Sequence, residues 1–156
     1  IGAPAVATVG TIAVEPSQVN VVPGLARFTV DVRHSENGDR VALVAEIEKL
    51  CKVIGREREL AVEVRTLRDR SAVSLSGAVA ETLKRACRAA GAEPRDMTSG
   101  AGHDSQILTA AANVGMLFVP SIGGRSHRAD EATAAEDVVL GTRALATALH
   151  EMAYTA

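Results

Sequence analysis

Aromatic residues make up only 2% of this chain of 156 residues, and tryptophan is absent. Proteins that bind single-stranded nucleic acid stack its bases on aromatic side chains, so this composition argues against such a function. The formal net charge of −2 likewise gives no electrostatic reason to expect DNA, RNA or anionic lipid as a partner. Hydrophobic residues reach 47%, so the chain can bury a core, and that core must consist of valine, leucine, isoleucine and alanine.

Cysteine and long apolar runs are also scarce. Cys51 and Cys87 both fall inside helical patterns, which favours free thiols over a disulfide framework or a zinc site. No apolar run approaches the roughly 18 residues of a membrane span, and no basic-plus-apolar targeting segment is visible. We therefore predict a cytoplasmic protein that does not bind membranes. The chain starts at Ile1, directly before a strand pattern, so we expect it to be part of a longer protein.

The region 1–70 has a β-β-α-β pattern. Residues 7–15 are rich in valine, threonine and isoleucine, and residues 25–33 alternate between apolar and polar side chains. The first composition is typical of a strand, and the alternation of the second is typical of an antiparallel strand with one face buried. A helix is predicted over 39–56, and a further strand over 60–67, where the alternation resumes. This order is most of a ferredoxin-like sandwich without its opening β-α unit.

The region 71–156 has the pattern of an open α/β layer structure. Helices are predicted over 75–90, 104–112 and 133–153, and the continuous apolar run 116–119 indicates a strand covered on both faces. The apolar stripe of the last helix is predicted to be Val138, Leu145, Leu149 and Met152. The chain as a whole is therefore expected to be of the α/β class, with two parts.

A histidine follows the apolar run, in a turn rich in glycine and serine. His127 stands where open α/β sheets bind ligands, outside the carboxyl end of a strand. A neutral imidazole there is a good ligand for zinc or a similar divalent ion. On spacing alone, a surface-loop histidine is the plainer interpretation. Glu131 is either a partner of His127 or the start of the next helix, and we favour the helix start because acidic residues suit that position.

A second histidine, His103, lies in a turn of small residues, Gly100, Ala101 and Gly102. Consecutive small residues leave backbone N–H groups available to hold an anion such as a carboxylate. Asp104 could orient the imidazole or could cap the helix that follows. The residues alone leave a functional and a structural interpretation of this turn open.

Asn20 and Arg33 form a further candidate pair. Arg33 lies on the polar face of the strand 25–33, and Asn20 lies in the loop that precedes this strand. An arginine fork and an amide together suit a carboxylate and a neighbouring carbonyl. On first principles, a surface salt bridge is the plainer interpretation of Arg33.

Four segments together carry a resemblance to a known family. They read ATVGTIAVEPSQVNVVPG, FTVDVR, SGAGHD and MLFVPSIGGRSH, the last followed by Glu131. In this order, and over nearly the whole chain, they resemble the C-terminal part of the allantoate amidohydrolase, N-carbamoyl-L-amino-acid hydrolase and beta-ureidopropionase family. These are metal-dependent amidohydrolases related to aminoacylases and zinc carboxypeptidases. The family usually has a proline where this sequence has Ala129.

The resemblance implies a role for each candidate. His127 matches the family's last metal ligand, Asn20 a substrate-binding asparagine, and Arg33 an arginine that holds the substrate carboxylate in the partner subunit's active site. The GAGHD turn matches residues that contact the substrate, and its histidine would also act in catalysis. The implied substrate-binding set is Asn20, Arg33, Gly100, Ala101, Gly102 and His103.

The resemblance also implies a fold and a reaction. Residues 1–70 would be part of a ferredoxin-like lid that forms the homodimer, and residues 71–156 the C-terminal part of an α/β metallohydrolase catalytic domain. The complete enzyme would use two divalent metals, zinc or manganese, to hydrolyse a C–N bond of a ureido or N-carbamoyl carboxylate. Allantoate, an N-carbamoyl amino acid and beta-ureidopropionate are the candidate substrates. The remaining ligands and the general base would come from the N-terminal catalytic half, so we expect the chain alone to be inactive.

Two alternatives stay open at this point. A related aminoacylase, deacetylase or dipeptidase would use the same activation of water. A non-catalytic ferredoxin-like dimerisation module would leave the histidines unused.

Overall fold

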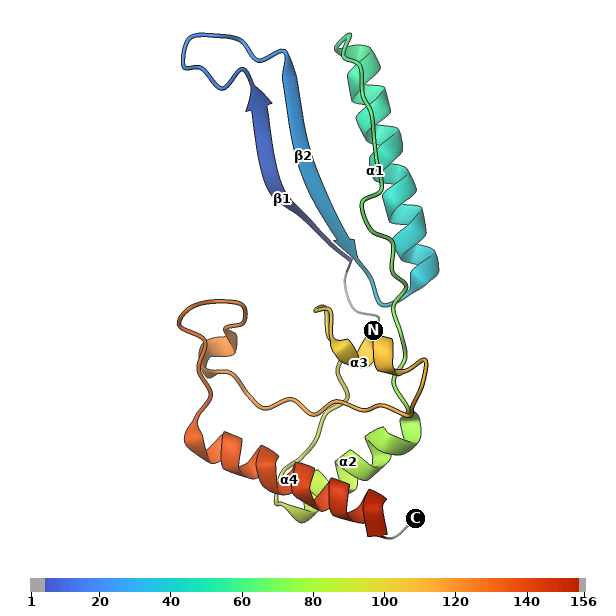
Figure 1. The fold of residues 1–156 in the computed structure, drawn as a ribbon, viewed down its shortest axis with the longest axis vertical. Coiled ribbons are helices and arrows are strands. Elements are labelled where there is room, and N and C mark those ends of the chain that lie inside the picture. Colours follow the sequence, from blue (N-terminus) through green and yellow to red (C-terminus); the bar gives the residue numbers. More distant parts are fainter. Residues whose placement is uncertain (1–4, 155–156) are drawn as a thin grey trace. The chain divides into compact units, whose positions relative to one another are not determined.

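The computed structural model describes residues 5–154, and the chain divides after Ala72 into two compact units. Figure 1 shows strands only in the first unit and most of the helices in the second. The α/β class expected from the sequence is confirmed. Over the described residues, no helix is long and apolar enough to cross a membrane.

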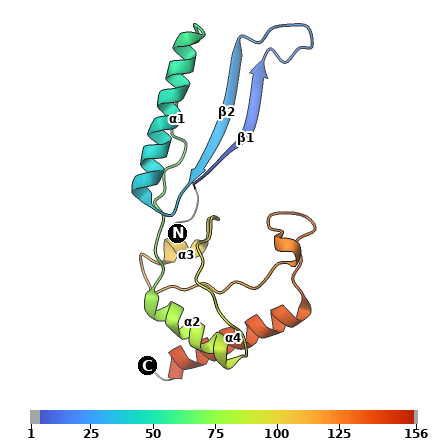
Figure 2. The same ribbon diagram turned by 180° about the vertical axis from the view of Figure 1, so that it is seen from behind.

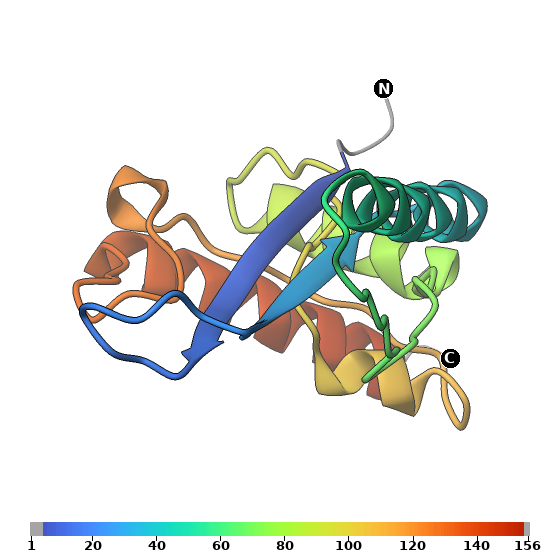
Figure 3. The ribbon, with the colours of Figure 1, turned by 90° about the horizontal axis from the view of Figure 1, so that it is seen from above.

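The first unit contains a β-hairpin. Strand β1 (Val6–Glu15) pairs antiparallel with β2 (Leu25–Arg33), as the alternation predicted. Val9 lies opposite Val30, and the register shifts between Val9 and Thr11, which marks a bulge. Figure 3 looks down on the two strands, with α1 (Asn37–Glu57) beside them. The predicted helix 39–56 is thus confirmed, with slightly wider limits.

Two segments predicted as strands, 60–67 and 116–119, are not strands in the structure. Among the described residues the only sheet is the β1–β2 pair, and both segments run without a hydrogen-bonded neighbour strand. Alternating or continuous apolar side chains indicate which faces of a segment are suited to burial. A strand also needs a neighbouring strand that hydrogen-bonds its backbone N–H and C=O groups.

The second unit is built on a helix pair. Helices α2 (Gly77–Ala89) and α4 (Ala135–Tyr154) pack against each other, and Figure 2 shows them crossing. These helices confirm the predictions over 75–90 and 133–153. The predicted helix 104–112 is shorter, because α3 spans only Asp104–Leu108 and turns follow it. Cys87 is buried and Cys51 half-buried, and both are free thiols.

The face of α4 that is buried is not the predicted one. Ala144 and Ala148 are buried, with Ala148 fully covered, whereas Leu149 is 54% exposed. The other members of the predicted stripe are also largely exposed: Val138, Leu145 and Met152. Small alanine side chains let α2 and α4 approach closely, so shape rather than hydrophobicity decides which face meets the partner helix. The core comprises Leu83, Ala86 and Ala148, with Val79 and Leu117 packed against it.

Gly115 allows the extended segment 114–120 to pass close to α2. A Cβ at this position would lie 2.5 Å from Val79 Cγ1 and 3.0 Å from Leu83 Cδ1. We expect Gly115→Ala to lower the free energy of unfolding by about 1–3 kcal/mol, because overpacking displaces core side chains. Urea unfolding measures this effect. Gly77→Ala is the matched control, since nothing lies within 4 Å of its added Cβ. Equal stability of the two variants would contradict this account of the core.

Candidate functional site

The candidate residues occur in both units. Asn20 and Arg33 belong to the first unit, whereas the turn 100–103 and His127 belong to the second.

The turn that contains His103 is held by its own side chains. Ser99 Oγ lies 2.6 Å from His103 Nε2, and the Ala101 N–H donates to Ser99 Oγ at 3.2 Å. His103 precedes the first residue of α3, and its backbone N–H donates to Gln106 Oε1 at 3.4 Å. The Ala101 N–H, one of the backbone groups that the sequence offered to an anion, therefore has a partner inside the turn. The half-buried imidazole is held in place by a serine four residues earlier.

Contacts also join this turn to the extended segment 114–120. The His103 ring meets the Phe118 ring edge-on, with centroids 5.7 Å apart, and Ser105 Oγ donates to Met116 Sδ at 2.9 Å. Neither Ser99 nor Phe118 was expected from the sequence as a partner of His103. Of the two roles that the sequence left open for Asp104, the structure favours the one at the helix start, because Asp104 is the first residue of α3, where its charge suits the helix N-terminus.

His127 lies in a closed loop between the extended segment and α4. A short 3-10 turn, η1 (Ile122–Gly124), opens the loop, and the Ile122 N–H donates to the Ala132 carbonyl at 2.8 Å. Gly123 and Gly124 have positive φ angles, and so does His127, at 58°. A residue with a Cβ seldom adopts this left-handed conformation, and such strain is often found at functional sites.

Glu131 interacts with His127 through the backbone. The His127 N–H donates to Glu131 Oε2 at 2.8 Å. The preferred sequence interpretation, in which Glu131 starts the following helix, is wrong, because α4 begins four residues later at Ala135. Nearby, Asp130 accepts hydrogen bonds from Arg125 and Arg128 at 2.8 Å each. The His127 imidazole is exposed.

Arg33 is engaged in an exposed ion pair on its own strand. Its Nε and Nη2 donate to the two carboxylate oxygens of Asp31, at 2.7 and 2.9 Å. This hydrogen bonding lowers the pKa of Asp31 and raises that of Arg33. The surface salt bridge that first principles favoured is therefore present. Asn20 is exposed in the hairpin loop 16–24, which is closed by the Gly24 N–H and the Glu15 carbonyl at 2.9 Å.

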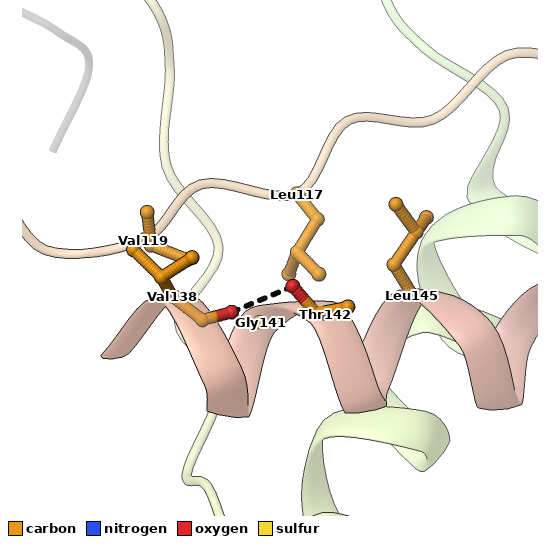
Figure 4. Close-up of a pocket in the computed structure, with 6 residues that line it drawn as sticks. All are labelled: Leu117, Val119, Val138, Gly141, Thr142 and Leu145. Carbon is orange, nitrogen blue, oxygen red and sulfur yellow. Dashed lines mark hydrogen bonds between the residues drawn. The ribbon is translucent and has the colours of Figure 1, made fainter. Parts of the chain in front are cut away.

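The second unit has an apolar groove between α4 and the segment 114–120 (Figure 4). Its volume is about 230 Å³, and the only polar side chain on its walls, Thr142, donates to the Val138 carbonyl at 2.7 Å. The lining residues are Leu117, Val119, Val138, Gly141, Thr142 and Leu145. The groove contains no candidate site residue, and its walls include part of the large apolar face of α4 that the core leaves uncovered.

Comparison with known proteins identifies the family. Residues 1–151 match the model of peptidase family M20/M25/M40. The chain belongs to this family. It is 33% identical over 154 residues to a protein named allantoate amidohydrolase from Escherichia coli K12, covering 99% of the chain and 38% of that protein. It is 36% identical over 137 residues to an N-carbamoyl-L-amino-acid amidohydrolase from Paenarthrobacter aurescens, covering 88% and 33%.

Solved structures agree with this assignment. An amidase of the hydantoinase/carbamoylase family from Burkholderia vietnamiensis superposes with a TM-score of 0.87, at 30% identity, over 93% of this chain and 35% of that one. The chain thus spans little more than a third of the length of the M20 relatives it matches. The resemblance expected from the four sequence segments is confirmed.

M20 amidohydrolases in general depend on divalent metals. Histidine is a suitable ligand, and an exposed His127 in a loop of fixed shape is consistent with one. Over residues 5–154, however, no three histidine, cysteine, aspartate or glutamate side chains are grouped to hold a metal ion. The described residues of this M20 chain therefore do not form a complete metal site by themselves.

Proposed function

We propose that this chain is the C-terminal part of a divalent-metal-dependent amidohydrolase that cleaves a C–N bond in a ureido or N-carbamoyl carboxylate. The observation that carries the proposal is the 33% identity, over 99% of the chain, to an allantoate amidohydrolase. The N-carbamoyl-L-amino-acid amidohydrolase relative supports the same substrate class. Allantoate, N-carbamoyl amino acids and beta-ureidopropionate share a carboxylate and a terminal ureido group.

The proposed roles follow the chemistry of each side chain. His127 would hold one metal ion of a zinc or manganese pair, and the chemistry that such a pair would supply is activation of water and polarisation of the carbonyl. Arg33 binds the substrate carboxylate through its planar fork of N–H groups. Asn20 hydrogen-bonds the ureido group. His103 stabilises charge that develops at the carbonyl, with the turn 100–102 beside it contacting the substrate.

The rest of the proposal concerns the assembly. Residues 1–70 form part of a lid and dimerisation domain, and residues 71–156 form part of the catalytic domain. The N-terminal catalytic half supplies the remaining metal ligands and the general base, and the enzyme acts as a cytoplasmic homodimer. Both units have many exposed large apolar side chains, which supports contact with further protein.

A substrate panel on the complete enzyme tests the reaction. The panel contains allantoate, N-carbamoyl amino acids and beta-ureidopropionate, with N-acetyl amino acids and dipeptides as the competing class. The proposal requires kcat/KM to be highest for a ureido or carbamoyl acid. Preference for the N-acetyl or dipeptide substrates would instead indicate an aminoacylase or dipeptidase. If no substrate turns over and no metal is bound, the chain is an interaction module.

The chain of 156 residues is expected to show no turnover of any panel substrate in saturating zinc or manganese. A hydrolytic metal site needs several ligands, and the described residues provide no group of three. The measurement is release of ammonia or free amino acid, with the complete enzyme under the same conditions as the control. Clear turnover by the chain alone would contradict the proposal that the N-terminal catalytic half supplies the remaining metal ligands and the general base.

A further inference from the structure

The loop 121–132 has a shape that its own residues determine. Its ends are joined by the Ile122 N–H and the Ala132 carbonyl at 2.8 Å, and the Gly124 N–H donates to the Ser121 carbonyl at 2.9 Å. The Ser121 hydroxyl donates to the Arg125 carbonyl inside the loop. These contacts fix the two ends and the first turn, but they do not reach the residue at which the backbone is most strained.

That residue is His127, whose φ angle of 58° places it in the left-handed region. For a residue with a Cβ this conformation is unfavourable, so it persists only where other contacts hold it. The contact present is the hydrogen bond from the His127 N–H to Glu131 Oε2, at 2.8 Å. A carboxylate that accepts from a backbone N–H forms one of the stronger hydrogen bonds in proteins.

The other nearby carboxylate is engaged elsewhere. Asp130 accepts from Arg125 at 2.8 Å and from Arg128 at 2.8 and 3.1 Å, so its oxygens serve the side chains of the loop. The two neighbouring acids therefore have different roles: Asp130 links two arginines, and Glu131 holds the backbone of the histidine.

We propose that Glu131 is a positioning residue for His127: its carboxylate holds the His127 backbone in the left-handed conformation and thereby sets the direction in which the imidazole leaves the loop. The inference that this serves metal binding rests on the proposed function. The inference that Glu131 fixes the loop does not depend on it. Because the hydrogen bond forms within the chain, the ligand is oriented before any metal binds.

The first test measures zinc affinity of the complete enzyme by competition with a chelator. Loss of a residue that orients a metal ligand typically weakens affinity 10- to 100-fold, and we expect about this loss for Glu131→Ala. Glu131→Gln keeps an acceptor oxygen at the same reach and should retain most of the affinity. Glu131→Asp keeps the charge on a shorter side chain and should behave like alanine. Glu136→Ala, in the first turn of α4, is the control.

The second test needs neither metal nor activity. Arg125 and Arg128 are trypsin sites inside the loop, so the cleavage rate after each, followed by mass spectrometry on the metal-free enzyme, reports how well the loop is held. Glu131→Ala and Glu131→Asp should be cleaved faster than the wild type, and Glu131→Gln at a similar rate. Unchanged cleavage of all three variants would overturn the proposal, as would a glutamine variant that behaves like alanine.

The two tests separate the two claims. If the wild-type enzyme binds no zinc, the proposed function fails, while the trypsin rates still decide whether Glu131 fixes the loop. If zinc binds and Glu131→Ala binds it as tightly as the wild type, Glu131 does not position a metal ligand, and the proposed function is unaffected.

Discussion

Replacing His127 with alanine is expected to remove one metal ion from the complete enzyme and to abolish hydrolysis. An imidazole contributes a strong bond to a divalent ion, and a catalytic metal supplies several kcal/mol of transition-state stabilisation. Since each 1.36 kcal/mol corresponds to a factor of ten, we expect kcat/KM to fall at least about a thousandfold. Metal analysis and steady-state kinetics on the same preparation measure both effects.

His150 provides the matched control for this experiment. It is also an exposed histidine of the second unit, and its ring packs on Tyr154 in α4, with centroids 5.0 Å apart. His150→Ala should leave metal content and kcat/KM close to those of the wild type. If His127→Ala keeps both metal ions and full activity, His127 is a surface-loop histidine after all, as its exposure alone would suggest.

Local patterns in the sequence predicted the elements whose hydrogen bonds are local. Three of the four helices and the β1–β2 hairpin appear within two residues of their expected limits, because each is closed by contacts between near neighbours in sequence. Local patterns could not decide whether the segments 60–67 and 116–119 form strands. Their backbone partners are not specified by their own residues, and over the described residues no strand lies beside them.

The candidate site shows the same division. Glycine and serine around the two histidines were enough to indicate turns, because these residues allow unusual backbone conformations and local hydrogen bonds. The contact of Ser99 with the His103 imidazole came only from the structure. Glu131 was one possible partner of His127 in the sequence, but the structure alone showed that it binds the His127 backbone. Each pair is four residues apart but lies in or beside a turn, where helical periodicity gives no information. The buried face of α4 was likewise not predicted, because the structure buries Ala144 and Ala148 and leaves the predicted apolar stripe exposed.

Replacing Arg33 with alanine is expected to raise KM for a carboxylate substrate sharply while leaving the metal content of the complete enzyme unchanged. A hydrogen bond between charged groups contributes roughly 1.5–3 kcal/mol, so KM should rise roughly ten- to a hundredfold. Arg33→Lys keeps the charge but loses the planar fork and should recover only part of the affinity. The measurements are initial rates across a substrate range, with metal analysis alongside.

Asp31 makes this prediction more specific. Its hydrogen bonds to Arg33 lower the pKa of the carboxyl group, so Asp31 is ionised at neutral pH and holds one side of the guanidinium. Arg33→Ala therefore also releases a carboxylate next to the proposed substrate position, and its repulsion adds to the loss of binding. Arg27→Ala is the control, because Arg27 lies on the same polar face of β2 and is also in an exposed ion pair, with Glu15. If Arg33→Ala and Arg27→Ala raise KM equally, the increase comes from the loss of positive charge on β2 and not from the loss of a binding site at Arg33. If only Arg33→Ala does so, and lysine recovers part of the loss, the fork of Arg33 is the group that binds the carboxylate.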